Sequence, residues 1–84
     1  MRTLAELGEA VRARRLALDL KQGQVADQAG VSQELLSRLE RGRLPEVGAR
    51  KLLSVLAVLG LELQFGEVGQ AGGLDGLRRE RGGA

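Results

Sequence analysis

The sequence predicts a small all-α domain of four to five short helices, followed by one short strand. With 84 residues, the chain is long enough for one domain and leaves no room for a second. Its apolar residues are mainly Leu, Ala and Val, with a single Phe and no Trp or Tyr, a composition that favours helices packed on helices. Apolar positions recur at helical spacing up to residue 59, and period-two alternation follows only at residues 61–65.

The composition also argues against several classes of function. The chain has no Cys, so it offers no disulfide and no thiolate nucleophile or metal ligand. It has no His, which is the usual general base near neutral pH and the commonest metal ligand. We therefore expect no enzyme activity, no metal site and no cofactor. Because there is no long apolar run and no signal-peptide segment, we expect a cytoplasmic protein without a membrane partner.

Glycine content divides the chain into two parts. Residues 1–65 contain six glycines, whereas the nineteen residues 66–84 contain seven. We therefore expect one folded domain over 1–65 and a flexible, Gly-rich tail over 66–84. Two interpretations of the tail remain open: its Leu74, Leu77 and residues 78–81 fold onto a partner, or it is a frayed end with no role.

The first helix is predicted from Thr3 to about Leu18. Thr3 followed by Glu6 is a capping box, in which side-chain oxygens bind the free N–H groups of the first turn. Asp19 then marks a turn. The positions that share the inward face of this helix are Leu4, Leu7, Val11 and Leu18.

Two short helices follow, over about 22–28 and from the N-cap Ser32 to about Arg41. Gly30 lies where the chain must turn between them, and Gly42 ends the second. The apolar positions predicted to face inward are Val25, Ala26, Ala29, Leu35, Leu36 and Leu39.

A fourth helix is predicted from about Glu46 to Leu59, where Gly60 stops it. Residues 52–59 are apolar almost all round, and a helix of this kind must be covered on more than one side. Because three short helices cover only one side, we expect a second chain to cover the other.

Residues 61–65 alternate apolar and polar side chains, which is typical of a strand. A lone strand is unstable in water, so its partner is expected to be the same strand of a second copy, or a strand of another protein. The alternative is that this segment lies over the fourth helix as coil. The residues predicted at the dimer interface are Leu56, Leu59, Leu61, Leu63 and Phe65.

Residues 22–39 have the spacing of a helix-turn-helix motif. Ala26 is small where the two helices cross, and Gly30 accepts a turn that a Cβ atom would hinder. The stretch LKQGQVADQAGVSQELLSRLERG resembles the helix-turn-helix of the lambda-repressor/Cro type, also called the XRE family. This resemblance covers residues 5–60, and ARKLLSVLAVLGLELQF is similar to HipB-like antitoxins, whose final strand pairs across a two-fold axis.

The resemblance implies a role in DNA binding for several residues. The second short helix would enter the major groove and contact bases through Gln33, Glu34, Ser37 and Arg38. Phosphate contacts are implied for Lys21, Gln22, Ser32, Arg41, Arg43, Arg50 and Lys51. Arg15 and Glu40 match a structural ion pair of the family, and Arg12 and Arg14 are interpreted as solvated charges of the first helix.

Two residues depart from the family pattern. Gly23 replaces a polar helix former and either permits close approach to a phosphate or is merely tolerated. Glu34 would repel phosphates unless it accepts a hydrogen bond from a cytosine N4 or pairs with Arg38 one turn further on. We favour the pair with Arg38.

Three functions follow as hypotheses. The first is a homodimeric, sequence-specific repressor that binds double-stranded DNA at an inverted-repeat operator. The second makes this repressor the antitoxin of a type II toxin-antitoxin pair, which neutralises a HipA-like kinase and represses its own operon; the alternative is a stand-alone phage- or plasmid-type XRE repressor. The third is a protein-interaction module without a DNA role, which the basic residues between 38 and 51 disfavour.

Overall fold

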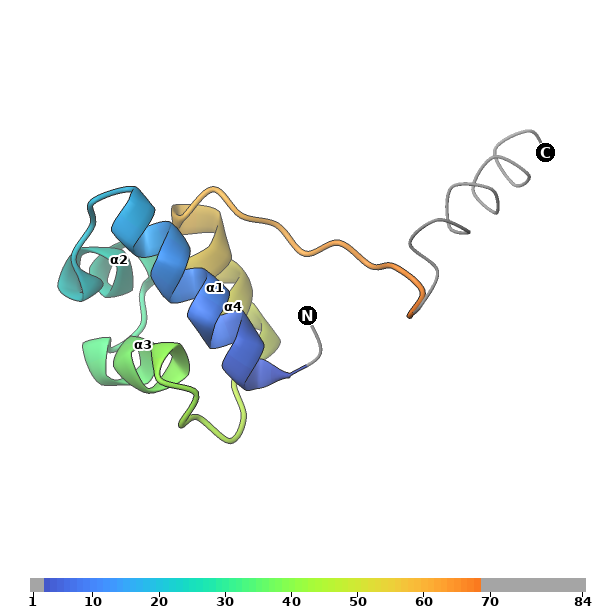
Figure 1. The fold of residues 1–84 in the computed structure, drawn as a ribbon. Helices are drawn as coiled ribbons and strands as arrows, with labels where there is room; N and C mark the ends of the chain where they lie inside the picture. Colours follow the sequence, from blue (N-terminus) through green and yellow to red (C-terminus); the bar gives the residue numbers. More distant parts are fainter. Residues whose placement is uncertain (1–2, 69–84) are drawn as a thin grey trace.

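The structure, a computed structural model, describes residues 3–68 and contains four α-helices in that range. These are α1 (Leu4–Ala17), α2 (Gln22–Ala29), α3 (Gln33–Glu40) and α4 (Ala49–Val58). Helix α1 packs against α3, and α2 packs against both α3 and α4. The short helices α2 and α3 lie together at one side of the domain, as Figure 1 shows. The predicted all-α domain is confirmed over the described residues.

Helix α1 begins as the sequence predicts and ends one residue earlier. The Oγ1 atom of Thr3 accepts a hydrogen bond from the N–H of Glu6 at 3.0 Å. At the other end the N–H of Leu20 donates to the Arg15 carbonyl, and Asp19 has a left-handed φ of 58°. Leu18, which we expected on the inward face, is 41% exposed because it lies beyond the last turn of the helix.

The turn between α2 and α3 follows the prediction closely. Gly30 has φ 71°, in the left-handed region that favours glycine, and the N–H of Val31 donates to the Ala26 carbonyl at 3.0 Å. The Oγ atom of Ser32 accepts from the N–H of Leu35 at 3.0 Å, so Ser32 is the N-cap of α3. Helix α3 then ends at Glu40, one residue before the predicted end.

Helices α1 and α3 approach each other at Gly8, a residue that the sequence analysis did not single out. Gly8 is buried, and a Cβ atom at this position would overlap the backbone carbonyl of Leu39. Backbone atoms cannot move aside as a flexible side chain can, so this crossing depends on the absence of a side chain.

Helix α4 begins at Ala49, three residues later than predicted. Its N-cap is Gly48, whose backbone is extended, with φ −65° and ψ 143°. Because glycine is unfavourable inside a helix, the chain stays non-helical through Gly48 and the helix forms after it. At its C-terminus, the N–H of Leu61 donates to the Leu56 carbonyl at 2.8 Å, around the left-handed Gly60.

All four helices contribute to one apolar core. Leu56 and Leu59, which we predicted at the dimer interface, belong to this core and are 4% and 0% exposed. Packing inside their own domain accounts for this burial, and the contact of Leu56 and Leu59 with a second copy stays a prediction. The core consists of Val11, Val25, Ala26, Leu36, Leu39, Val55, Leu56 and Leu59.

Residues 61–67 form no helix or strand and lead away from the helices (Figure 1). The predicted strand over 61–65 is not formed within the described part of this one chain, where it has no neighbouring strand to pair with. Its pairing with a second copy stays a prediction. The tail residues Leu74, Leu77 and 78–81 lie outside the described residues.

Candidate nucleic-acid interface

Helix α3 has one buried face and one exposed polar face. Leu36 and Leu39 are fully buried and fix the helix against the core. The predicted base-contacting residues lie on the other side, where Gln33, Glu34 and Arg38 are exposed and Ser37 is half-buried. The core therefore holds α3 in place while its polar side chains remain available to a ligand.

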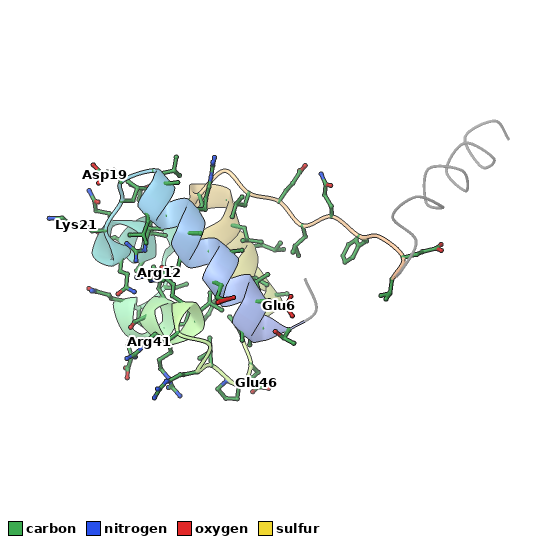
Figure 2. The ribbon with its side chains drawn as sticks, viewed as in Figure 1. Glu6, Arg12, Asp19, Lys21, Arg41 and Glu46 are labelled. Atoms are coloured by element: carbon green, nitrogen blue, oxygen red, sulfur yellow. The ribbon has the colours of Figure 1, made fainter. Side chains whose placement is uncertain are left out.

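The ends of α3 also carry predicted phosphate-contacting residues at the surface. Ser32 is exposed at the N-terminus, and its hydroxyl oxygen already accepts the capping hydrogen bond. Arg41 is exposed at the C-terminus, where its Nε donates to the Ser37 carbonyl at 3.3 Å. Figure 2 shows Arg41 beside α3 and Lys21 at the outer edge of α2.

The surface charge over residues 38–51 is more basic than the sequence count suggests. This stretch has five basic and two acidic residues, but one of the acids, Glu40, is buried and paired. Glu46 is the single exposed acid among them. The five bases are all exposed: Arg38, Arg41, Arg43, Arg50 and Lys51. A local excess of positive charge of this kind attracts polyanions.

A buried network ties the exposed elements to α1. Arg15 donates from Nε to Oε2 of Glu40 at 2.7 Å, from Nη2 to Oε1 at 2.9 Å, and from Nη1 to the Leu20 carbonyl at 2.8 Å. The hydrogen bond to Glu40 raises the pKa of the Arg15 guanidinium, burial opposes this rise, and the charge of Glu40 adds to it. Arg15 therefore stays charged at all ordinary pH values.

Gln22 belongs to the same network. Its Nε2 donates to Oε1 of Glu40 at 3.0 Å, so the side-chain amide that we expected at a phosphate is directed into the protein. What the start of α2 offers to a phosphate is its backbone N–H groups and the exposed side chain of Lys21. The backbone N–H of Lys21 itself donates to Oε1 of Gln24 at 2.8 Å.

The structure shows the surroundings of the two residues that depart from the family pattern, and the favoured pair of Glu34 with Arg38 is absent from its described part. Glu34 and Arg38 form no ion pair with each other in the described structure. An exposed pair at this spacing gains little energy in water, so its absence costs little. Gly23, at the start of α2, lies next to the side-chain oxygen of Gln33.

Arg14 has a structural partner that sequence analysis missed. Its Nε donates to the Leu59 carbonyl at 2.9 Å, so this charge stabilises the C-terminus of α4 and is not merely solvated. The two residues are far apart in sequence, and no local pattern signals such a contact.

An open apolar hollow of about 520 Å³ lies between α1, α4 and the C-terminal segment. The predicted interface residues Leu61, Leu63 and Phe65 line it on one side. Leu61 is half-buried, whereas Leu63 and Phe65 are 43% and 94% exposed. The helical walls are formed by Leu4, Leu7, Ala10, Val11, Leu52 and Leu56.

The described range offers neither a metal site nor a membrane span. Residues 3–68 contain no group of three or more acidic, His or Cys side chains able to hold a metal ion. None of the four described helices is both long and apolar enough to span a bilayer.

Comparison with protein families gives a match. Residues 6–64 match the family described as helix-turn-helix domain, which is part of the XRE-like group, and this match covers most of the chain. No curated protein matches the chain.

Proposed function

The chain belongs to the helix-turn-helix domain family, and on this premise we propose that it is a sequence-specific DNA-binding transcriptional repressor. The observation that carries the proposal is the polar face of α3, where Gln33, Glu34 and Arg38 are exposed while the opposite face is fixed in the core. We also propose that the protein acts in the cytoplasm, as expected for a DNA-binding regulator without a membrane partner.

Helix α3 has the dimensions of a recognition helix. Its eight residues span roughly 12 Å, and an α-helix fits into the major groove of B-DNA. Arg38 can donate two hydrogen bonds to O6 and N7 of guanine, and Gln33 can bind adenine through its amide. Glu34, which has no ion-pair partner in the described structure, is suited to accept from a cytosine N4. Ser37, which has a shorter side chain, is proposed to contact a base next to those that Gln33, Glu34 and Arg38 contact.

The basic residues around α3 are proposed to bind phosphates. Counterion release on binding makes such contacts strongly salt-dependent and independent of sequence. At the start of α2, Gln22 would contact a phosphate through its backbone N–H, since its side-chain amide donates to Glu40. The remaining proposed contacts are Lys21, Ser32, Arg41, Arg43, Arg50 and Lys51, all of which are exposed.

We propose that the active form is a homodimer joined through residues 61–65. Leu63 and Phe65 are exposed apolar side chains, and they stand beside an open apolar hollow on the same chain. A two-fold axis would place residues 61–65 of one copy over the apolar hollow of the other. Each copy would then bury the same apolar surfaces. The two α3 helices would then meet half-sites of an inverted repeat, about 34 Å apart.

A finer proposal is that this repressor is the antitoxin of a type II toxin-antitoxin pair with a HipA-like kinase as its toxin. The resemblance of residues 49–65 to HipB-like antitoxins supports it; the alternative is a stand-alone XRE repressor. Co-expression with the product of an adjacent gene tests this. Relief of growth arrest and co-purification of the two proteins are expected for an antitoxin, and neither is expected for a stand-alone repressor.

The DNA-binding proposal is tested by fluorescence anisotropy. The purified protein is titrated against the DNA upstream of its own gene and against a scrambled duplex of equal length, over a series of salt concentrations. We expect two protomers per site, tighter binding to the upstream DNA, and an affinity that falls steeply with salt. Equal affinity for both duplexes would contradict sequence-specific repression.

A further inference from the structure

Gly23, near the start of α2, lies beside the side chain of Gln33, the first residue of α3. A Cβ atom on Gly23 would stand 3.4 Å from Oε1 and 3.9 Å from Cδ of Gln33. That is ordinary van der Waals contact for a single carbon atom. Any atom beyond it that continues in the same direction would take the volume occupied by the Gln33 amide.

The backbone of Gly23 gives no reason for a glycine at this position. The glycines with a left-handed φ in the described chain are Gly30, Gly42 and Gly60, and Gly23 is not among them. Glycine is also one of the least favourable residues in a helix. What the surroundings limit is the size of a side chain at position 23, because the Gln33 amide lies just beyond the place of a single carbon atom.

The Gln33 side chain is exposed, and its amide lies next to the open position at Gly23. In the described structure Gln33 makes no side-chain hydrogen bond, and the nearby Gln22 amide is directed toward Glu40. Gln33 therefore keeps its donors and its acceptor available, and a larger side chain at position 23 would limit the directions that its amide can take. Base recognition by Gln depends on that direction, because both hydrogen bonds to an adenine must be aligned at once.

We propose that Gly23 is a specificity-determining position, which sets the direction of the Gln33 amide by leaving room for it. The inference rests on the proposed function, in which Gln33 contacts a base. A bulky residue at position 23 would displace the amide and weaken discrimination at the one base pair that Gln33 reads. Affinity for the other positions of the operator would change little.

This role differs in its consequences from a close approach of the Gly23 backbone to a phosphate. A side chain that blocks a phosphate weakens binding to all sequences by the same factor. A side chain that displaces Gln33 changes the preference at a single base pair. The two effects are separated by measuring relative affinities for a set of operators that differ at one position each.

The experiment compares wild type, Gly23→Ala, Gly23→Leu, Gln33→Ala and the double variant Gly23→Leu/Gln33→Ala by quantitative binding-site selection. Ala and Leu both improve helix propensity over Gly, so Gly23→Ala is the matched control for stability. A bidentate base contact discriminates by roughly 5- to 150-fold. We expect wild type and Gly23→Ala to retain this preference, and Gly23→Leu to lose it at the same base pair as Gln33→Ala.

The double variant should lose no more discrimination than either single variant, because both changes remove the same contact. An unchanged preference in Gly23→Leu, or a uniform loss of affinity over all operators, would overturn the proposal. A measurement without DNA distinguishes this failure from failure of the proposed function. In NMR spectra the side-chain amide signals of Gln33 should shift in Gly23→Leu, while those of the distant Gln64 stay in place.

The Gln33 signals can shift although the wild-type protein has no sequence preference. In that case the contact between position 23 and Gln33 is confirmed, but the proposed function is wrong, and the specificity role is overturned with it. If the signals do not shift, the proposal fails whatever the protein binds.

Discussion

Arg15 of α1 and Glu40 of α3 form a two-point ion pair, with Nε–Oε2 at 2.7 Å and Nη2–Oε1 at 2.9 Å. The Glu40 side chain is 1% exposed, and the carboxylate also accepts from Gln22 of α2. One carboxylate thus joins the three helices that make up the proposed DNA-binding unit. The Arg15 guanidinium extends the network to the turn after α1 through the Leu20 carbonyl.

Replacing Glu40 with Ala should strongly destabilise the domain. The change leaves a largely buried guanidinium and the Gln22 amide without their acceptor, and breaking a buried pair in this way costs about 3–5 kcal/mol. Urea denaturation followed by circular dichroism measures the loss. Glu46→Ala, at an exposed acid, is the matched control and should change the free energy of unfolding by less than about 0.5 kcal/mol.

The pH dependence of this effect follows from the raised pKa of Arg15. A base whose pKa is higher in the folded state contributes its full stability below the pKa of the unfolded chain and loses it only as pH rises through the folded value. For arginine both values lie far above neutral pH. The difference between wild type and Glu40→Ala should therefore stay constant between about pH 6 and about pH 9. A difference that shrinks toward about pH 9 would contradict this assignment.

Gly8→Ala is expected to disrupt the packing of α1 on α3. The added methyl group would overlap the Leu39 carbonyl, so the two helices must separate, at a cost of about 1–3 kcal/mol or more. The thermal melting temperature measures the effect. The matched control is Gly48→Ala, where no atom lies within 4 Å of the added group and a loss below about 1 kcal/mol is expected. Equal losses in the two variants would show that the crossing has room for a side chain.

The helices were predictable because their signals are local. The Ser32 cap, the Gly30 turn and the 3.6-residue spacing of Leu36 and Leu39 each lie within a few residues, and the structure has these elements within about one residue of the predicted bounds. The start of α4 was predicted too early because Gly48 was allowed inside a helix. A glycine within a stretch of strong helix formers indicates either a helix boundary, as at Gly48, or a close helix crossing. The same observation would have identified Gly8 as a crossing point.

Contacts between distant segments were not predictable from local pattern. Nothing near Arg14 indicates that it binds the Leu59 carbonyl. The inward direction of the Gln22 amide follows from the position of Glu40, which local sequence does not supply. Likewise, an apolar face on α4 does not reveal whether Leu56 and Leu59 face their own core or a second copy, because burial in either place requires the same residue types.

Asp19→Gly should stabilise the protein. Asp19 is the one non-glycine residue with a positive φ in the described chain, and glycine adopts this conformation without a steric cost. The gain, reduced by the greater freedom of glycine in the unfolded chain, should be up to about 1 kcal/mol. Asp27→Gly, at an exposed position inside α2, is the matched control and should lose about 0.5–1 kcal/mol. A loss in both variants would indicate that the Asp19 side chain itself stabilises the turn.

Arg38→Ala and Lys51→Ala should weaken DNA binding in different ways. Both residues are exposed bases, but Arg38 projects from the polar face of α3 whereas Lys51 lies in the first turn of α4. Loss of a base contact at Arg38 should reduce affinity for the operator by about 1–3 kcal/mol and remove the preference at one base pair. Loss of a phosphate contact at Lys51 should weaken binding to all sequences alike and reduce the slope of log K against log salt by about 1.

Anisotropy titrations over a salt series, with the operator and with duplexes changed at single positions, measure both effects. A uniform loss in Arg38→Ala would move this residue from base recognition to phosphate binding, and an unchanged salt slope in Lys51→Ala would exclude its phosphate contact.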